Sequence, residues 1–292
     1  MGKMVPWCFL TFFILSVLTA VPGDAARPDK ISGITNYPVP SADRQTRTLF
    51  NVNNMSGWIQ FDGLSGYNTA LAKAGVIYPR GTANVIFQDG FIWGGYSHDG
   101  QEPSLRVGGQ TYNIGTQPGK ILSVGVPQNL SDTQVRIYRI RPDWETAPDN
   151  DLRRDAAELL NIDSAQVTQS QINAVRAQYG TDWNEWPVDM GAPFYDLNGN
   201  GIYEPLMGET PGLANADQVI WFVCNDLNSE LTHNLHGSPP IGLELQITIW
   251  AFKQNGALGQ LAFRRYRLIN KSGFLFDNTY IALWSDPDVG DA

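Results

Sequence analysis

The stretch Leu243-Glu-Leu-Gln-Ile-Thr-Ile-Trp-Ala251 decides the fold class of this chain. Its apolar and polar side chains alternate, with Leu243, Leu245, Ile247, Ile249 and Ala251 at one parity and Glu244, Gln246 and Thr248 at the other. Successive side chains of a β-strand point to opposite faces of the sheet. The alternation therefore predicts a strand with one buried face.

The segments after this strand also have β character. Thr279–Trp284 is an apolar run typical of a strand, and Gln260–Asn270 is a second candidate. In Gln260–Asn270 Leu261 and Phe263 have one parity, and Tyr266 and Leu268 have the other. An extra residue would restore both sets to one face, so we predict a β-bulge near Arg264–Arg265.

Short apolar runs separated by glycines fill the region between Phe50 and Ile140. They are Trp58–Phe61, Asn84–Gln88, Phe91–Tyr96, Ser104–Val107 and Gln134–Ile140. Short strands at close spacing with glycine-rich turns are typical of sandwiches and barrels. We therefore expect a mainly β fold, a β-sandwich or jelly-roll-like pair of sheets.

Residues 149–180 interrupt this β pattern with two predicted helices. Apolar side chains recur at helical spacing in residues 152–160. The second helix begins at Thr168, which forms a capping-box pattern with Gln171, and is expected to end at Gly180 as its C-cap. We interpret the pair as a small helical insertion that fills packing space rather than as a lid or a partner-binding surface.

Residues 1–26 have the three parts of a secretory signal peptide. Lys3 supplies the positive charge, Val5–Leu18 forms the apolar segment, and Ala20 or Ala25–Ala26 offers small residues for cleavage. The apolar run is shorter than the roughly 20 residues that span a bilayer. We expect export, cleavage and a location outside the cell or on the outer cell surface.

Three regions follow the signal peptide. We expect an N-terminal β region at 27–148, the helical insertion at 149–180, and a second β region at 181–292. The last region stops in an acidic loop with no closing element. From this we expect the chain to be truncated at Ala292.

The excess of acidic residues restricts the classes of partner that this chain can bind. The formal net charge is −9, and an acidic surface repels phosphate backbones and anionic lipids, which disfavours nucleic acid and membrane surfaces. Excess carboxylates suit cations instead. No later stretch has the length of a transmembrane segment. After cleavage the single remaining cysteine is Cys224, which lies in an apolar run and is predicted to be a buried, inert thiol.

The segment Asp196-Leu-Asn-Gly-Asn-Gly-Ile-Tyr-Glu204 carries the strongest motif. Its oxygen-bearing groups are the side chains of Asp196, Asn198, Asn200 and Glu204 and the backbone carbonyl of Ile202, and Gly201 stands at the sharp turn. This order matches the first nine positions of an EF-hand-like calcium loop. A plain Asn/Gly-rich turn without metal uses the same residue types.

The ligand that would close this loop is not in its usual place. Position 12 is Met207 rather than Glu, so the closing carboxylate is expected from Glu209, Asp217 or a distant loop. We predict one Ca²⁺ held by the five loop oxygens, with Asp217 as the closing candidate. No helix is predicted before the loop, which argues against a helix–loop–helix sensor.

A second acidic group follows the last predicted strand. Asp286, Asp288 and Asp291 place three carboxylates within six residues, and such groups repel one another unless a cation or solvent intervenes. A second cation site and a solvated acidic loop both fit this pattern.

The sequence holds no clear catalytic motif. Ser97-His98-Asp99 has the residue types of a triad, but adjacent residues do not converge into triad geometry. His233 and His236 lie near Glu230, and because a Gly-Ser-Pro-Pro loop follows, we interpret them as a surface pair rather than as ligands of a transition metal. An enzyme is therefore the less favoured class.

Aromatic residues leave a carbohydrate-related alternative open. Trp144, Trp183 and Trp186 are suited either to stacking on sugar rings or to a place in the core. Paired carboxylates for glycoside hydrolysis also stay open, because a chain with 29 acidic residues offers many candidates.

An ordered set of short motifs resembles the N-terminal region of large exported proteins of the Bacteroidota type. The motifs are Asn53-Asn-Met-Ser-Gly-Trp-Ile59, Phe91-Ile-Trp-Gly-Gly95, Trp186-Pro-Val-Asp-Met-Gly-Ala-Pro193 running into Asp196–Gly201, Gly237-Ser-Pro-Pro-Ile-Gly242, Ile269-Asn-Lys-Ser272 and Trp284-Ser-Asp-Pro-Asp288. The resemblance implies secretion across two membranes, cell-surface attachment or release, and contact with the secretion machinery through a C-terminal type IX sorting domain, which this chain lacks. The family commonly has Asp where this chain has Glu204, and it has no counterpart of His233 or His236.

These observations favour one function class and leave a second open. The first is a secreted or cell-surface module, structural, adhesive or ligand-binding, that calcium stabilises and that contacts a glycan or another surface component. The second is an extracellular carbohydrate-active protein, either a glycan-binding module or a glycosidase. A closed sandwich with buried tryptophans favours the first class. An open cleft with facing carboxylates and exposed tryptophans favours the second.

Overall fold

The structure, a computed structural model, describes residues 45–100 and 102–288. Antiparallel strands dominate these residues, and three α-helices accompany them. The expectation of a mainly β, sandwich-like fold with a small helical insertion is confirmed. The predicted signal peptide, residues 27–44 and Asp291 lie outside the described residues.

The first sheet is built around one long strand. The sheet order is β1-β2-β5-β6-β17, and β7 also pairs with β6. The bounds are β1 (Arg47–Phe50), β2 (Ser56–Gln60), β5 (Val76–Ile77), β6 (Asn84–Ser97), β7 (Ser104–Gly109) and β17 (Phe276–Pro287). Two predicted strands are thus the single strand β6. Its central Gly90 lets Trp284 approach, because a Cβ there would lie 2.4 Å from the indole nitrogen.

The second sheet contains the strand that decided the fold class. Its order is β11-β14-β15-β16, and β8 pairs with β14. The bounds are β8 (Gln117–Pro118), β11 (Tyr138–Ile140), β14 (Gln218–Asn225), β15 (Leu243–Ala251) and β16 (Ala262–Asn270). The prediction of one buried face for β15 is wrong, because both faces are buried. Glu244 pairs with Lys271, and Gln246 donates to the Met190 carbonyl.

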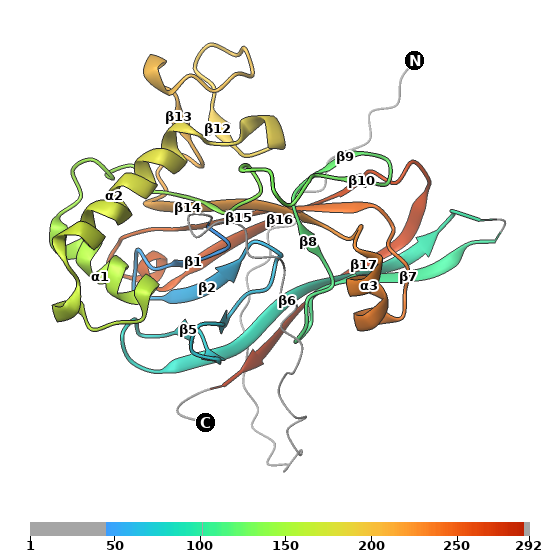
Figure 1. The fold of residues 1–292 in the computed structure, drawn as a ribbon, viewed down its shortest axis with the longest axis horizontal. Coiled ribbons are helices and arrows are strands. Elements are labelled where there is room, and N and C mark those ends of the chain that lie inside the picture. The colour runs from blue at the N-terminus through green and yellow to red at the C-terminus, as the bar shows by residue number, and fades with distance from the viewer. Residues whose placement is uncertain (1–44, 101, 289–292) are drawn as a thin grey trace. The chain divides into compact units, whose positions relative to one another are not determined.

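The two sheets stack face to face and enclose the main core (Figure 1). It takes Phe50, Ile59, Phe91 and Trp93 from the first sheet and Ile220, Phe222, Cys224, Leu245, Ile247 and Ile249 from the second. The other face of β14 carries Val219, Trp221 and Val223 into a second core with Tyr138, Trp186 and Met190. A third, smaller core lies around the two long helices.

Short elements complete the fold. The remaining strands of two or three residues are β3 (Tyr67–Asn68), β4 (Lys73–Ala74), β9 (Ile121–Ser123), β10 (Val126–Pro127), β12 (Phe194–Tyr195) and β13 (Thr210–Pro211). The short helices are α3 (Ser229–His236) and the 3₁₀ helices η1 (Ser164–Gln166), η2 (Val188–Met190), η3 (Pro205–Met207) and η4 (Ala257–Gln260). The β12–β13 hairpin stands above the outer face of the second sheet (Figure 1).

The helical insertion consists of α1 (Asp149–Leu160) and α2 (Gln169–Asn184). The predicted capping box is confirmed, since Thr168 and Gln171 bond each other's backbone groups. The prediction that Gly180 ends the second helix is wrong, because α2 continues through it to Asn184. A Cβ at Gly180 would lie 2.7 Å from the Trp144 ring, so this glycine serves close packing instead.

The predicted bulge near Arg264–Arg265 is also wrong. β15 and β16 pair from Leu243↔Asn270 to Ala251↔Ala262 without a register shift. Arg264 faces into the sandwich, where its guanidinium contacts Asp89 at 2.8 Å. Phe263 faces outward and stacks on Trp250 at 5.5 Å. The two apolar sets therefore point to opposite faces, each of which meets its own apolar partners.

No helix within residues 45–100 or 102–288 combines the length and apolar character needed to cross a membrane.

Candidate functional site

The predicted calcium loop closes the β12–β13 hairpin. Phe194 pairs with Pro211 and Tyr195 with Thr210, and the fourteen residues Asp196–Glu209 connect them. Gly199 and Gly201 both have φ near +74°. A side chain at either position would be strained by the backbone conformation, although no neighbour crowds it. The hairpin therefore fixes both ends of a turn that its two glycines make possible.

Asp196 organises this turn through backbone donors. Its carboxylate accepts the N–H groups of Gly199 at 2.7 Å and Gly201 at 2.8 Å. These hydrogen bonds, that of Gly201 first, lower the pKa of Asp196. The carboxylate is consequently ionised at neutral pH and lies at the centre of the turn.

Glu204 faces the two asparagines across the turn. The side-chain amide nitrogens of Asn198 and Asn200 donate to one oxygen of Glu204, at 2.9 and 2.8 Å. The amide oxygens of Asn198 and Asn200 accept the backbone N–H groups two residues further on, those of Asn200 and Ile202 respectively. The side chains at positions 3, 5 and 9 are thus brought together, as the motif predicts.

Glu209 is the carboxylate that closes the loop on itself. It is only 2% exposed, and its two oxygens accept the N–H groups of Leu197 at 3.1 Å and Glu204 at 2.7 Å. Asp217 lies elsewhere, before β14, where its carboxylate accepts the Lys253 N–H at 2.6 Å. The sequence offered both acids as closing ligands, and the structure places Glu209 at the loop.

The loop has the oxygen groups for a hard cation, but not as a cluster of carboxylates. Asp196, Glu204 and Glu209 with two amide oxygens and the Ile202 carbonyl make six groups, the lower limit for calcium. Within the described ranges no three His, Cys, Asp or Glu side chains form a metal-holding group. The amide N–H donors of Asn198 and Asn200 now face Glu204, so binding requires both amides to rotate and present oxygen.

The second predicted acidic group sits at the end of β17. Asp286 lies opposite Gln88 in the ladder, and the backbone N–H of Asp288 donates to the Val85 carbonyl at 3.1 Å. The pKa of Tyr112 is raised by burial and also by Asp286. Asp286 therefore helps to keep the neighbouring Tyr112 hydroxyl protonated. Asp291 lies beyond the described residues.

The three candidate sugar-stacking tryptophans belong to packed regions. Trp186 is buried, with its indole N–H donating to the Pro193 carbonyl at 2.7 Å. Trp183 packs partly buried against the second core, and Trp144 packs against α2 at Gly180. Trp186 is thus buried, whereas Trp144 and Trp183 are half-buried.

His236 and the triad-like tripeptide have structural partners, while His233 is exposed on α3. His236 closes α3, where its ring contacts the Gly109 carbonyl at 3.2 Å and burial lowers its pKa. His98 contacts Asp277 at 3.1 Å, while Asp99 pairs with Arg106 at 2.8 Å. The Ser97-His98-Asp99 side chains therefore do not form a catalytic chain.

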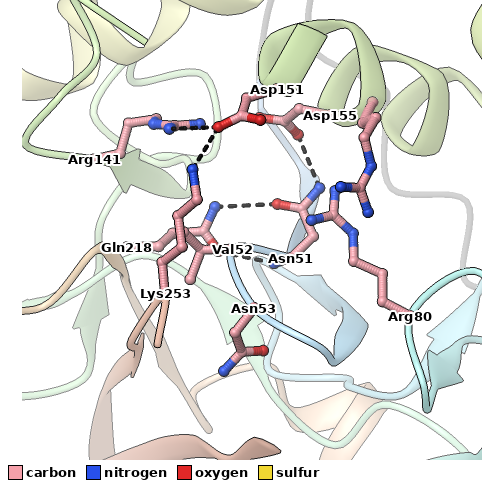
Figure 2. Close-up of a pocket in the computed structure, with 10 residues that line it drawn as sticks. Asn51, Val52, Asn53, Arg80, Arg141, Asp151, Asp155, Gln218 and Lys253 are labelled. Atoms are coloured by element: carbon pink, nitrogen blue, oxygen red, sulfur yellow. Dashed lines mark hydrogen bonds and ion pairs between the residues drawn. The ribbon is translucent and has the colours of Figure 1, made fainter. Parts of the chain in front are cut away.

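A small polar pocket lies where α1 meets β1 and β14 (Figure 2). Its volume is about 90 Å³, room for a few waters or a small ion. It is lined by Asn51, Val52, Asn53, Arg80, Arg141, Asp151, Arg154, Asp155, Gln218 and Lys253. Beneath it Asp155 accepts from Arg139 at 2.6 Å and from Tyr179 at 2.7 Å.

Most charges around this pocket are already paired. Arg80 binds Glu158 through two hydrogen bonds of 2.6 and 2.9 Å, and Lys253 contacts Asp151 at 2.5 Å. These pairs join α1 to the loops that follow β5 in the first sheet and β15 in the second. We therefore interpret the pocket as the junction that holds the helical insertion on the sandwich.

A larger hollow lies beside the calcium-type loop. Its volume is about 590 Å³, and it is lined by Thr133, Gln134, Tyr138, Asn184, Glu185, Trp186, Pro187, Val188, Asp189, Gly201, Ile202 and Tyr203. Three separate segments meet there, which is why periodicity and motif spacing did not reveal it. The loop supplies one wall through Ile202 and Tyr203, so the conformation of the loop determines the shape of the hollow.

A scan against protein-family models, a search of curated proteins and a search of solved structures returned no match for this chain.

Proposed function

We propose that this chain is an extracellular binding module whose loop 196–209 takes up one Ca²⁺ and forms one wall of a ligand groove. The observation that carries the proposal is the set of oxygen groups gathered along one two-glycine turn. Asp196 and the buried Glu209 accept backbone N–H groups of the loop, and Glu204 accepts the side-chain amides of Asn198 and Asn200. A bound cation would neutralise these carboxylates and fix the loop. The adjoining 590 Å³ hollow is the concave surface that such fixing would preorganise.

The carbohydrate-active alternative receives less support. A glycan site would need exposed aromatic faces, and Trp144, Trp183 and Trp186 are packed. Two carboxylates of the hollow also have cationic partners, because Glu185 contacts Arg136 and Asp189 contacts Lys120. The proposal therefore rests on binding rather than on hydrolysis.

The extracellular location follows from the signal-peptide pattern and from the resemblance to exported surface proteins. N-terminal sequencing of protein recovered outside the cell tests it. A mature chain that begins after residue 20 supports export, whereas a mature chain that still begins at Met1 contradicts it.

Calorimetric titration of the metal-free protein with CaCl₂ tests the cation site. We expect one binding event, a higher Tm with calcium than with EGTA, and loss of both effects in Asp196→Asn. At calcium about 1,000-fold above Kd, the stabilisation should reach about 4 kcal/mol.

The matched control for this titration is Asp189→Asn, which removes a carboxylate from the same hollow but outside the loop. This variant should retain calcium binding. Absence of heat together with an unchanged Tm would show that the loop is a plain turn.

A further inference from the structure

The polar pocket at the foot of the helical insertion gathers an unusual number of cations (Figure 2). Its lining includes the side chains of Arg80, Arg141, Arg154 and Lys253. They come from four separate segments, which are the loop after β5, the residue after β11, helix α1 and the loop after β15. The chain has 20 Lys and Arg and a net charge of −9. Four of these 20 cations thus border one pocket of about 90 Å³.

The ion pairs around the pocket leave one positive charge without a partner. The pairs are Arg80–Glu158, Arg139–Asp155, Arg141–Asp143 and Lys253–Asp151. Within each pair the two charges cancel. Arg154 is exposed and forms no hydrogen bond or ion pair with any residue that the structure describes. Its guanidinium is therefore the uncompensated charge at this pocket.

The paired guanidinium groups also keep donors that meet no acceptor. Arg80 binds Glu158 through Nε and Nη2, and Arg141 binds Asp143 through the same two nitrogens. A guanidinium has five N–H donors, so Nη1 of each group is left without a hydrogen bond among the described residues. Arg141 is only 6% exposed. Because a buried charged donor is costly without an acceptor, an anion in the pocket would relieve this cost.

The two carboxylates of the wall are already occupied. One oxygen of Asp155 accepts from Arg139 and the other accepts from Tyr179. Asp151 contacts Lys253 at 2.5 Å. The donors that remain in the pocket therefore outnumber the acceptors that remain, which suits an anionic ligand.

We propose that this pocket binds a phosphate group. Arginine is the residue that proteins favour for phosphate, because the guanidinium fork matches the spacing of its oxygens. Four cationic groups from four segments suit the four oxygens of a phosphate better than the two of a carboxylate. A volume of about 90 Å³ holds a few waters and hence one small ion. Anything attached to the phosphate must therefore remain outside the pocket.

The burial of the lining residues gives the pocket a floor and a mouth. Asn51, Arg141 and Gln218 are buried, whereas Arg154 and Lys253 are exposed. Figure 2 shows Arg80 across the pocket from Arg141 and Lys253. A phosphate that enters at the mouth would bridge α1 to loops of both sheets and raise the stability of the folded chain by mass action. This site does not depend on calcium.

Calorimetric titration of the purified protein with sodium phosphate, in EGTA and in a buffer free of phosphate and sulfate, tests the proposal. We expect one saturable binding event and a higher Tm with phosphate than with sodium chloride at the same ionic strength. Arg154→Gln removes the unpaired guanidinium and should weaken binding at least tenfold. Lys73→Gln removes an exposed cation of β4, outside the pocket, and should leave binding unchanged. Thermal melts establish that both variants are folded.

Two further probes define the ligand. Glycerol 3-phosphate presents the same group on a larger molecule, so the tighter of the two phosphates identifies a free ion or an ester as the preferred form, and either supports the site. Acetate should bind at least tenfold more weakly, and acetate that binds as tightly as phosphate would overturn the assignment. Absence of saturable heat with both phosphates would also overturn it. So would equal weakening by Arg154→Gln and Lys73→Gln, since this would show only a general attraction between charges.

Discussion

At the scale of single residues, Asp62 is an acid in an unfavourable place. It is buried, and its carboxylate accepts the Leu64 N–H at 3.1 Å. Burial raises its pKa from 3.8 to about 7, and backbone hydrogen bonds only partly oppose this rise. In the unfolded chain the pKa returns to about 4. Between about pH 4 and pH 7 the folded protein therefore keeps a proton that the unfolded chain has already released. The free energy of unfolding falls across that window as the pH rises.

Replacing this acid by its neutral analogue should remove the pH dependence. We expect Asp62→Asn to raise Tm at pH 8, where the native carboxyl is ionised in the core, and to change Tm little near pH 4. Asp99→Asn is the control, because Asp99 is paired with Arg106 and should give no gain at pH 8. Equal effects of Asp62→Asn at both pH values would contradict the assignment.

Gly180 allows a test in which the sign of the effect decides. In an open helical position, Gly→Ala stabilises a helix by about 1 kcal/mol. Here the added methyl meets the Trp144 ring, and overpacking costs about 1–3 kcal/mol. We expect Gly180→Ala to lower the free energy of unfolding in urea melts. In a Trp144→Leu background the same change should become neutral or stabilising, and persistent destabilisation there would mean that the ring is not the cause.

At the scale of elements, sequence patterns predicted what local chemistry determines. The alternation of Leu243–Ala251 and the Thr168–Gln171 capping box both gave correct elements. The failures have distant causes. Arg264 faces inward because it pairs with Asp89, which lies 175 residues away in the sequence. Without that partner in view, the break in parity looked like a bulge. The second face of β15 is buried by residues near Met190, which the pattern of the strand itself does not encode.

In the calcium-type loop, too, the sequence predicted the contacts between nearby residues but not the choice of closing ligand. The spacing of Asp196 to Glu204 predicted which side chains converge, because these residues are neighbours in sequence. The choice between Glu209 and Asp217 depends on how the hairpin packs. The only signal in the sequence was that Glu209 lies close behind the loop and Asp217 lies farther on.

Two conservative variants separate these acids. Glu209→Gln places an amide N–H against the backbone donors of Leu197 or Glu204, so we expect weaker calcium binding and a lower Tm even in EGTA. Asp217→Asn should leave the calcium affinity unchanged. Calorimetric titration of both variants checks this, and the reverse order of effects would assign the closing role to Asp217.

At the scale of the whole molecule, two sheets share one continuous core, and the insertion is joined to them through polar contacts. Arg139 and Asp155 form a buried ion pair that Asn51 and Tyr179 extend by hydrogen bonds. Removing one partner of such a pair leaves an uncompensated charge and costs about 3–5 kcal/mol. The helices and the sandwich should therefore unfold together, as one transition seen by both far-ultraviolet and aromatic circular dichroism.

Because Cys224 is buried, the rate at which its thiol is labelled reports how fast the core opens. The thiol lies fully enclosed in the main core between the sheets, and burial raises its pKa well above the usual range. Reagents such as dithionitrobenzoate react with the thiolate, so labelling of the mature chain must wait until the sheets separate. When closing is slow compared with labelling, the colour change follows the unfolding rate itself. A stabilising cation should lengthen this time, and labelling as fast as that of an unfolded peptide would show that the core is not closed.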